Sequence, residues 1–247
     1  MSRGADDDAA RSAGKRRLDM LAQLAGNGGT LRLCHVCRDA TGATGAGIML
    51  MSATTSNGSV CTTDAVSALL ESLQYDLGEG PCIDAYLGDA PVAEPDIGSP
   101  ARARWPAFAP PALAAGARAV FGFPLRVGAA RLGALNLYRA TAGPLSDAQH
   151  GDALIAADIA AQAVLLMQAG APPGRLASEL DDGGEFHFVV HQAAGMIAAQ
   201  LGVDVAQALV RLRGHAFGNG RDLTEVAHDV VERRLRLEPS AEGHRPQ

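Results

Sequence analysis

Residues 170–185, GAPPGRLASELDDGGE, divide the chain into two parts of different character. Prolines, glycines and acidic residues at this density are typical of a linker and unfavourable inside a helix or strand. The residues before them contain strand-like and helix-like patterns, whereas residues 186–237 contain helical patterns alone. With 247 residues, the chain is long enough for two domains. We therefore predict a mixed domain at 17–169 and a helical domain at 186–237.

Composition limits what lies outside the two domains. Residues 1–16 and 238–247 are polar, so we expect both ends to be disordered. The N-terminus lacks the apolar segment of a secretory signal, and the apolar runs are shorter than the roughly 20 residues of a membrane span. We expect a cytoplasmic protein without a membrane partner. The net charge of −6 argues against a general polyanion-binding protein.

The first domain shows both hydrophobic periodicities. The predicted strands are 46–51, 60–63, 91–97, 119–125 and 132–138. The predicted helices are 17–41 with a break at 26–29, 63–74, 82–87, 105–115 and 146–167. Prolines in 91–97 place that strand at a sheet edge. Two hairpins among helices predict an α+β fold, in which an antiparallel sheet is flanked by helices.

The second domain contains the pattern of three helices. The first spans about 186–200 and is ended by Gly202. Asp204 and Asp222 stand where the N-caps of the next two helices are expected. Glu225 follows Asp222 at the spacing of a capping box. A bundle of about 50 residues is marginal alone, so we expect it to lean on a partner chain or on the first domain.

The stretch VHQAAGMIAAQLG at 190–202 places a glycine in the middle of a helix. A glycine there costs about 1 kcal/mol relative to alanine. Because Ala194 and Ala198 adjoin Gly195, this strip of the helix carries only small side chains. Such a strip admits close approach of a helix within a bundle or dimer, or of a different partner. The residues alone leave both interpretations open.

Three segments of the second domain resemble the ANTAR domain: VHQAAGMIAAQLGV, ALVRLRGHAF and LTEVAHDVV. The resemblance implies a three-helix module of bacterial transcription antitermination regulators, which binds RNA stem-loops and brings RNA close to its first helix. The RNA-binding residues that it implies are His191, Gln192, Ala194, Gly195, Ala198, Arg211, Arg213 and His215.

One position departs from the family pattern. The family carries a basic residue after Gln-Ala, where this chain has Ala194, so one phosphate contact is expected to be missing. Residues 186–237 hold six arginines and five acidic residues, a net charge of +1 (6 − 5). A second interpretation therefore stays open: a regulatory module that docks on a protein or completes a dimer without binding RNA.

Segments of the first domain resemble the GAF domain, a sensory module: GATGAGIML, QYDLGEGPC with PVAEPDI, and FGFPLRVGAARLGALNLYR. The resemblance implies a cavity between the sheet and its covering helices, which holds a small molecule in some members. No motif identifies a ligand or cofactor. The lining that we expect is Tyr75, Cys82, Phe121, Phe123, Asn136 and Tyr138. The same aromatic residues are more often part of a filled core.

Together the two resemblances imply a cytoplasmic, dimeric regulator. The first domain would sense a signal, and the second would bind structured RNA. The helix at 146–168 has enough apolar residues for a core face and a partner face, so we expect the dimer contact there. Coupling would require the signal to favour one arrangement of that helix.

No catalytic constellation is recognisable in the sequence, and we expect no enzyme. GEGP at 78–81 lacks the Lys-Ser/Thr of a phosphate-binding loop. Cys34-His35-Val36-Cys37 has no second ligand pair for a structural zinc site, so we expect no metal. Cys34 and Cys37 are three residues apart, which suits two buried small side chains on one helix face. Four cysteines in a chain of this length do not predict a disulfide scaffold.

Overall fold

A computed structural model describes residues 2–24, 29–51, 56–99, 104–169 and 185–238. It divides the chain into two compact units, Met1–Gly183 and Gly184–Gln247. The division falls at the predicted linker, most of which, like the tail from 239 on, lies outside the described residues. Each unit is described by itself below.

The first unit is built on a five-stranded antiparallel sheet in the order β2-β1-β5-β4-β3. The strands are β1 (Gly45–Met51), β2 (Ser56–Thr62), β3 (Val92–Glu94), β4 (Ala119–Val127) and β5 (Ala130–Arg139). Both predicted hairpins are present, and β3 is an edge strand as its flanking prolines indicate. The α+β prediction is confirmed.

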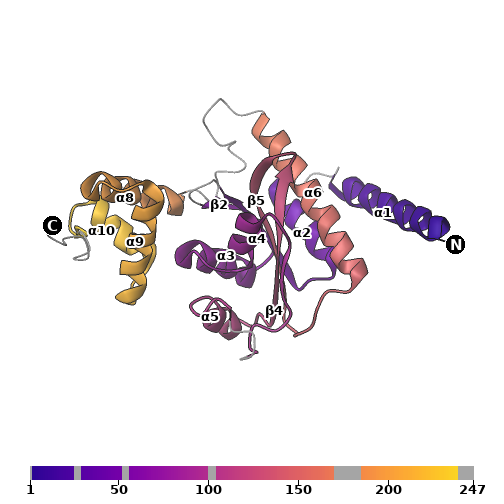
Figure 1. The fold of residues 1–247 in the computed structure, drawn as a ribbon, viewed down its shortest axis with the longest axis horizontal. Helices are drawn as coiled ribbons and strands as arrows, with labels where there is room; N and C mark the ends of the chain where they lie inside the picture. Colours follow the sequence, from indigo (N-terminus) through magenta and orange to yellow (C-terminus); the bar gives the residue numbers. More distant parts are fainter. Residues whose placement is uncertain (1, 25–28, 52–55, 100–103, 170–184, 239–247) are drawn as a thin grey trace, which may run out of the picture. The chain divides into compact units, whose positions relative to one another are not determined.

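Helices cover both faces of this sheet (Figure 1). One layer contains α1 (Ser2–Leu24), α2 (Gly29–Thr41) and α6 (Asp147–Ala169). The other contains α3 (Ala65–Leu77), α4 (Pro81–Gly88) and α5 (Ala109–Ala114). The last of these is shorter than the predicted 105–115, because Trp105 has a φ of 52° and interrupts the helical conformation.

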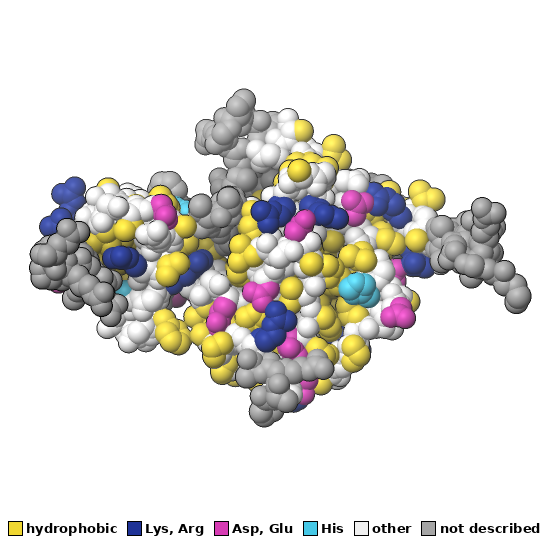
Figure 2. Space-filling model, in the orientation of Figure 1, with side chains coloured by type: hydrophobic (Ala, Val, Ile, Leu, Met, Phe, Trp, Pro, Cys, Tyr) yellow, Lys and Arg dark blue, Asp and Glu magenta, His cyan; other side chains and the backbone are white. Residues whose placement is uncertain are grey.

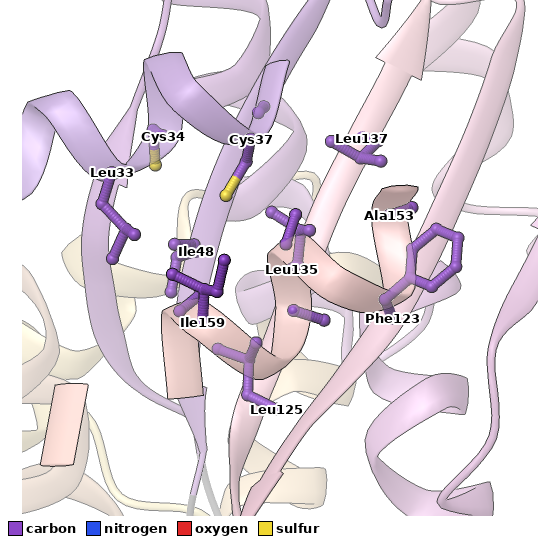
Figure 3. Packing of buried hydrophobic residues seen from close by; sticks show 14 of the residues in the cluster. Leu33, Cys34, Cys37, Ile48, Phe123, Leu125, Leu135, Leu137, Ala153 and Ile159 are labelled. Atoms are coloured by element: carbon purple, nitrogen blue, oxygen red, sulfur yellow. The ribbon is translucent and has the colours of Figure 1, made fainter. Parts of the chain in front are cut away.

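The main core lies between the sheet and the α2–α6 layer (Figure 3). Alternate residues of β4, namely Phe121, Phe123 and Leu125, point into it and are at most 1% exposed. Leu135 and Leu137 of β5 point to the same side. The intervening residues of both strands therefore face α3 and α4, as the two-residue period of a strand requires.

Helix α4 lies directly on strand β4 at a glycine. A Cβ atom at Gly122 would stand 2.3 Å from the carbonyl oxygen of Pro81, the first residue of α4. Such a separation is far inside van der Waals contact, and the neighbouring atom belongs to the backbone. The absence of a side chain at Gly122 therefore sets how closely α4 approaches the sheet.

The prediction that residues 1–16 are disordered is wrong, since α1 begins at Ser2. Alanine, arginine and lysine favour helix formation in this segment. The helix is also attached to α6 by two ion pairs, Arg16 with Asp152 and Arg17 with Asp158. The polar composition was read as disorder because these long-range contacts are not visible in the sequence.

Helix α6 has the predicted length but is more apolar than the sequence analysis indicated. Its 23 residues, with a mean hydropathy of 1.4 in the most apolar window, meet the length and composition of a membrane span. Seven of its residues are buried against the sheet and α2. Leu154, Leu165 and Leu166 are exposed on its outer side.

A disulfide joins Cys34 of α2 to Cys61 of β2. This corrects the interpretation of Cys34 as a free buried side chain. Cys37 and Cys82 are free and buried. The pairing escaped prediction because the two cysteines are 27 residues apart in sequence and meet only when α2 packs on the edge of the sheet.

The second unit contains α8 (Glu185–Leu201), α9 (Val205–Gly218) and α10 (Leu223–Val231), which confirms the three-helix prediction. Both predicted N-caps are present. The Asp204 side chain accepts a hydrogen bond from the Gln207 amide, and Asp222 accepts from the amides of Thr224 and Glu225.

We predict that Gly122→Ala destabilises the first unit by about 2–3 kcal/mol, because α4 must move off the sheet. Fluorescence of Trp105, the only tryptophan in the chain, would follow urea unfolding of this unit. Gly88→Ala is the control, since a Cβ there meets nothing within 4 Å. Equal stabilities of the Gly122 and Gly88 variants would contradict the close contact.

Candidate functional site

Helix α8 uses one face to hold the second unit together. Val190, Ala193, Ala194 and Ile197 are completely buried where α8 packs on α9 and α10. This placement separates Ala194 from the predicted RNA-binding set, because its side chain points into the bundle. The sequence analysis expected Ala194 to remove a phosphate contact. Because a side chain at this position lies inside the bundle, the structure does not support that expectation.

The opposite face of α8 carries an exposed strip of small or polar side chains. Gln192, Gly195 and Ala199 share this face at helical spacing and are exposed. A Cβ atom at Gly195 would meet nothing within 4 Å. No packing contact within the described chain therefore explains the glycine, which leaves the space beside it open to a partner.

A groove of about 670 Å³ begins where this strip ends. It lies between α8 and the segment that follows α10. Its lining is Met196, Ala199, Gln200, Val230, Arg233, Leu235 and Arg236. The Gln200 amide donates a hydrogen bond of 2.6 Å to the carbonyl of Leu237, which fixes the segment after α10 against α8.

Arg233 adopts a backbone conformation that favours glycine. Its φ is +61°, directly after the C-cap of α10 at Glu232. Glycine is the usual residue at this position, and the left-handed conformation costs other residues roughly 1–2 kcal/mol. The chain accepts this cost and gains a guanidinium on the groove wall. Strain retained at a surface groove is a recognised sign of function.

Within the described part of the chain, Arg233 and Arg236 make no ion pair, in contrast to the arginines around them. Arg221 and Arg234 both bind Asp229 at 2.7 Å, and their hydrogen bonds lower the pKa of that carboxyl. The acidic side chain is thus occupied by arginines outside the groove. The two groove arginines stay available for an anionic partner.

Figure 2 shows arginine side chains among hydrophobic ones on the second unit. The α9 residues of the predicted RNA-binding set do not lie together on one side of the helix. Arg211 and His215 are four residues apart and share a flank of the helix, whereas Arg213, two residues from Arg211, points to another side. All three are half-buried, as are His191 and Ala198.

The structure therefore brings together only part of the predicted RNA-binding set: Gln192 and Gly195 stand on one exposed strip. The sequence analysis missed Arg233 and Arg236. Their signal was present as basic residues after the last helix. It could not be used without knowing that Leu237 folds back onto α8.

The predicted ligand-binding residues of the first unit lie on two faces of the sheet. Phe121 and Phe123 belong to the core under α2 and α6. The other four, Tyr75, Cys82, Asn136 and Tyr138, lie on the side covered by α3 and α4 and are at most 5% exposed. No single cavity can be lined by all six.

Glu71 of α3 is the least expected group on that side. It is 3% exposed, and neither carboxylate oxygen has a hydrogen-bond partner among the described residues. A Cβ at Gly47 of β1 would stand 2.1 Å from Oε1, so the glycine makes room for this carboxyl. Burial raises the pKa of Glu71 to about 8, although the nearby Ser59 side chain acts in the opposite direction without a hydrogen bond of normal geometry. Glu71 therefore holds a proton at neutral pH.

Asn136 stands at the centre of the same sheet face. It is 1% exposed, and its Oδ1 atom also has no partner among the described residues. Its neighbours across the sheet are Gly47 on β1 and Gly122 on β4. Glu71 fills the space over the first glycine, and the start of α4 fills the space over the second. The space on either side of Asn136 is thus occupied by the Glu71 side chain and by the backbone at the start of α4.

The remaining polar groups on this side have structural partners. The Tyr138 hydroxyl donates to Asp64, which also caps α3 through the Ser67 amide. The side-chain Oε1 of Gln74 accepts a hydrogen bond from the Cys82 amide at 2.7 Å and so holds the first turn of α4. Across the described residues, no group of three His, Cys, Asp or Glu side chains could hold a metal ion.

Comparison with known proteins identifies the second unit. Residues 185–231 match the family model of the ANTAR domain, and they coincide with α8, α9 and α10. The chain therefore carries an ANTAR domain. It has no significant match among curated proteins.

Solved structures similar to the chain include GAF domains. Those of phosphoenolpyruvate-protein phosphotransferases from Coxiella burnetii and Acinetobacter are each 13% identical, with TM-scores of 0.49 and 0.48. They cover 65% and 70% of this chain and 96% and 99% of their own. A GAF domain/HD domain protein from Geobacter sulfurreducens is 16% identical over 60% of this chain and all of its own, with a TM-score of 0.41. The fold of the first unit is established by its own strand order, β2-β1-β5-β4-β3.

We predict that Gly195→Ala stabilises α8 by about 1 kcal/mol, because alanine is the better helix former and the added methyl meets open space. Hydrogen exchange of the α8 amides would measure this. Gly214→Ala on α9, where a Cβ also meets nothing, is the matched control and should stabilise its helix similarly. Destabilisation by the first change alone would reveal a packing contact at Gly195.

We predict that the first unit loses stability as pH rises from about 4.5 to 8. Glu71 has an ordinary pKa of 4.5 and a folded-state pKa of about 8, so the folded state binds the proton more tightly over this window. Glu71→Gln should flatten this loss and raise the free energy of unfolding at pH 8 by a few kcal/mol.

Urea unfolding followed by Trp105 fluorescence at several pH values would test this. Glu94→Gln is the control, because Glu94 is equally buried but accepts a hydrogen bond from the Asp96 amide. An unchanged pH slope in the Glu71 variant would show that this carboxyl is not the responsible group.

Proposed function

We propose that this protein is a signal-responsive regulator whose ANTAR domain binds structured RNA stem-loops and thereby controls transcription termination. The family match at 185–231 supports the RNA-binding part. The GAF-like first unit is the sensor in this proposal. The protein acts in the cytoplasm as a dimer, so that two ANTAR domains can engage paired loops.

The observation that carries the proposal is the strip of α8 that leads into the arginine-lined groove. Gly195 and Ala199 let another backbone approach the helix closely. Arg233 and Arg236 stand at the end of this path and can contact phosphates or stack on unpaired bases. Small side chains beside the groove guanidiniums suit RNA, which has an anionic backbone and flat bases.

The modest net charge of the domain determines how it would bind. Each domain offers the two groove arginines, so few phosphate contacts form per loop. With two such contacts the logarithmic slope of affinity against salt is only about −1 to −2 per domain. Affinity then depends mainly on base and shape contacts in the loop, which favours selectivity for structured RNA over duplexes.

A second candidate function is docking on a protein. Val210 and Phe217 of α9 are 67% and 65% exposed and share a flank with Arg213. An exposed apolar flank of this kind is typical of a protein contact. It lies on a different helix from the groove, so the two functions can be tested by separate substitutions.

We predict that Arg233→Gly weakens binding to a dual stem-loop RNA at least tenfold while the domain stays folded. Glycine suits the left-handed backbone at this position, so stability should be kept or rise by up to about 1 kcal/mol. Each domain loses one of the two guanidiniums that line the groove. Affinity would be measured by fluorescence anisotropy against salt, with a scrambled hairpin as the reference RNA.

Arg234→Ala is the matched control, because Arg234 is paired with Asp229 and does not line the groove. It should bind RNA as the unchanged protein does. Equal losses in both variants would indicate a general charge effect. Absence of loop-dependent binding by the unchanged, folded protein would reject RNA binding. Binding of a protein partner that is lost in Phe217→Ser would then favour the docking function.

A further inference from the structure

Three of the four cysteines lie in one cluster between α2 and the sheet. Cys34, Cys37 and Cys61 are at most 5% exposed and belong to the main core. Figure 3 shows Cys34 and Cys37 projecting from the same side of α2 toward the strands. Cys34 and Cys61 are oxidised in a disulfide, and Cys37 is free. A covalent link thus joins a core helix to a strand of the sheet.

The strand on the far side of this link lies at an edge of the sheet. β2 is an edge strand, paired only with β1. Its pairing is irregular, with register shifts after Ile48 and after Leu50. Edge strands with broken ladders open locally at lower free energy than central strands. The disulfide therefore restrains an edge strand whose pairing is irregular.

The cellular compartment bears on the role of this disulfide. Proteins that bind RNA in bacteria work in the cytoplasm, where thiols are kept reduced and disulfides are chiefly catalytic or redox-sensing. We infer that the Cys34–Cys61 disulfide is a redox-sensing site: a cellular dithiol reduces it, which releases β2 from α2. This inference rests on the proposed function, because it names the signal that the first unit senses.

The chemistry is complete with a dithiol as co-reactant. One thiolate of the dithiol attacks a sulfur of the disulfide and forms a mixed disulfide, and the other cysteine leaves as a thiolate. The second thiol of the reductant then displaces the remaining cysteine. The protein gains two electrons and two protons as Cys34 and Cys61 thiols, and the reductant becomes a cyclic disulfide. Oxidation by a disulfide of the same class reverses the reaction.

Cys37 offers an internal control. It lies one turn from Cys34 on α2 and in the same cluster. Burial raises the pKa of its thiol to about 12, so it carries almost no thiolate at neutral pH and cannot exchange with the disulfide. Replacing Cys37 should leave the redox response unchanged, whereas replacing Cys61 should remove it.

The helix that carries Cys34 connects the switch to the rest of the unit. α2 packs on α6 as well as on β1 and β2. Among the described helices, α6 is the one that precedes the ANTAR domain in sequence. A change in how α2 is held therefore acts on the element that precedes the RNA-binding unit.

The first experiment measures the bond itself. The full chain, prepared without reductant, is treated with increasing dithiothreitol under native conditions, alkylated and analysed by mass spectrometry. We expect Cys34 and Cys61 to become alkylated together while Cys37 and Cys82 stay protected. Cys37→Ser should give the same titration. Reduction that occurs only in denaturant would identify a purely structural disulfide and overturn the inference.

The second experiment measures the consequence. Oxidised and reduced protein are compared by hydrogen exchange and by affinity for the dual stem-loop RNA, beside Cys61→Ser and Cys37→Ser. We expect faster exchange in β2 and α2 on reduction, and a change in RNA affinity of at least fivefold. Cys61→Ser should match the reduced protein in both states, and Cys37→Ser should respond as the unchanged chain does.

The outcomes separate the two claims. Identical exchange in β2 and α2, or equal RNA affinity in the two redox states, would overturn the switch. A protein that binds no RNA in either state would contradict the proposed function, and the alkylation and exchange results would still decide whether the disulfide is reduced and releases β2.

Discussion

The contact between Gly122 and the backbone of Pro81 sets how closely the α3–α4 layer lies on the sheet. With α4 held there, the Gln74 side chain of α3 can reach the Cys82 amide, and the two helices become one layer. In the same layer Glu71 fills the space over Gly47, and its carboxylate oxygens have no hydrogen-bond partner among the described residues. The buried proton on Glu71 is therefore a consequence of the packing and needs no ligand.

The glycine on α8 differs from those of the sheet. Other atoms of the chain occupy the space over the sheet glycines, whereas Gly195 faces open space. The ANTAR match supports the proposal of an RNA partner, and the groove is the site that we propose for it. Arg233 is the strongest local sign, since a left-handed backbone at a helix end would be easier for glycine. Free cations at the end of an open strip are what an RNA loop requires.

Local signals in the sequence predicted much of the fold. Helix periodicity, the cap at Asp204 and the two hairpins were all readable, because each depends on residues close in the chain. Features that depend on the register between strands could not be predicted from the sequence. Phe121 pairs with Leu137, so the intervening Asn136 falls on the other face and the expected ligand set is divided. The groove arginine Arg233 was hidden for a similar reason, because the segment after α10 folds back onto α8.

The central claim is that the exposed strip of α8 and the groove beside it form the RNA-binding face. The most direct test is hydrogen exchange of the full chain with and without a dual stem-loop RNA. The account predicts protection at 192–200 and at 230–237, with a scrambled hairpin giving none. Protection confined to the flank of α9 that carries Val210 and Phe217, or no protection at saturating RNA, would contradict it.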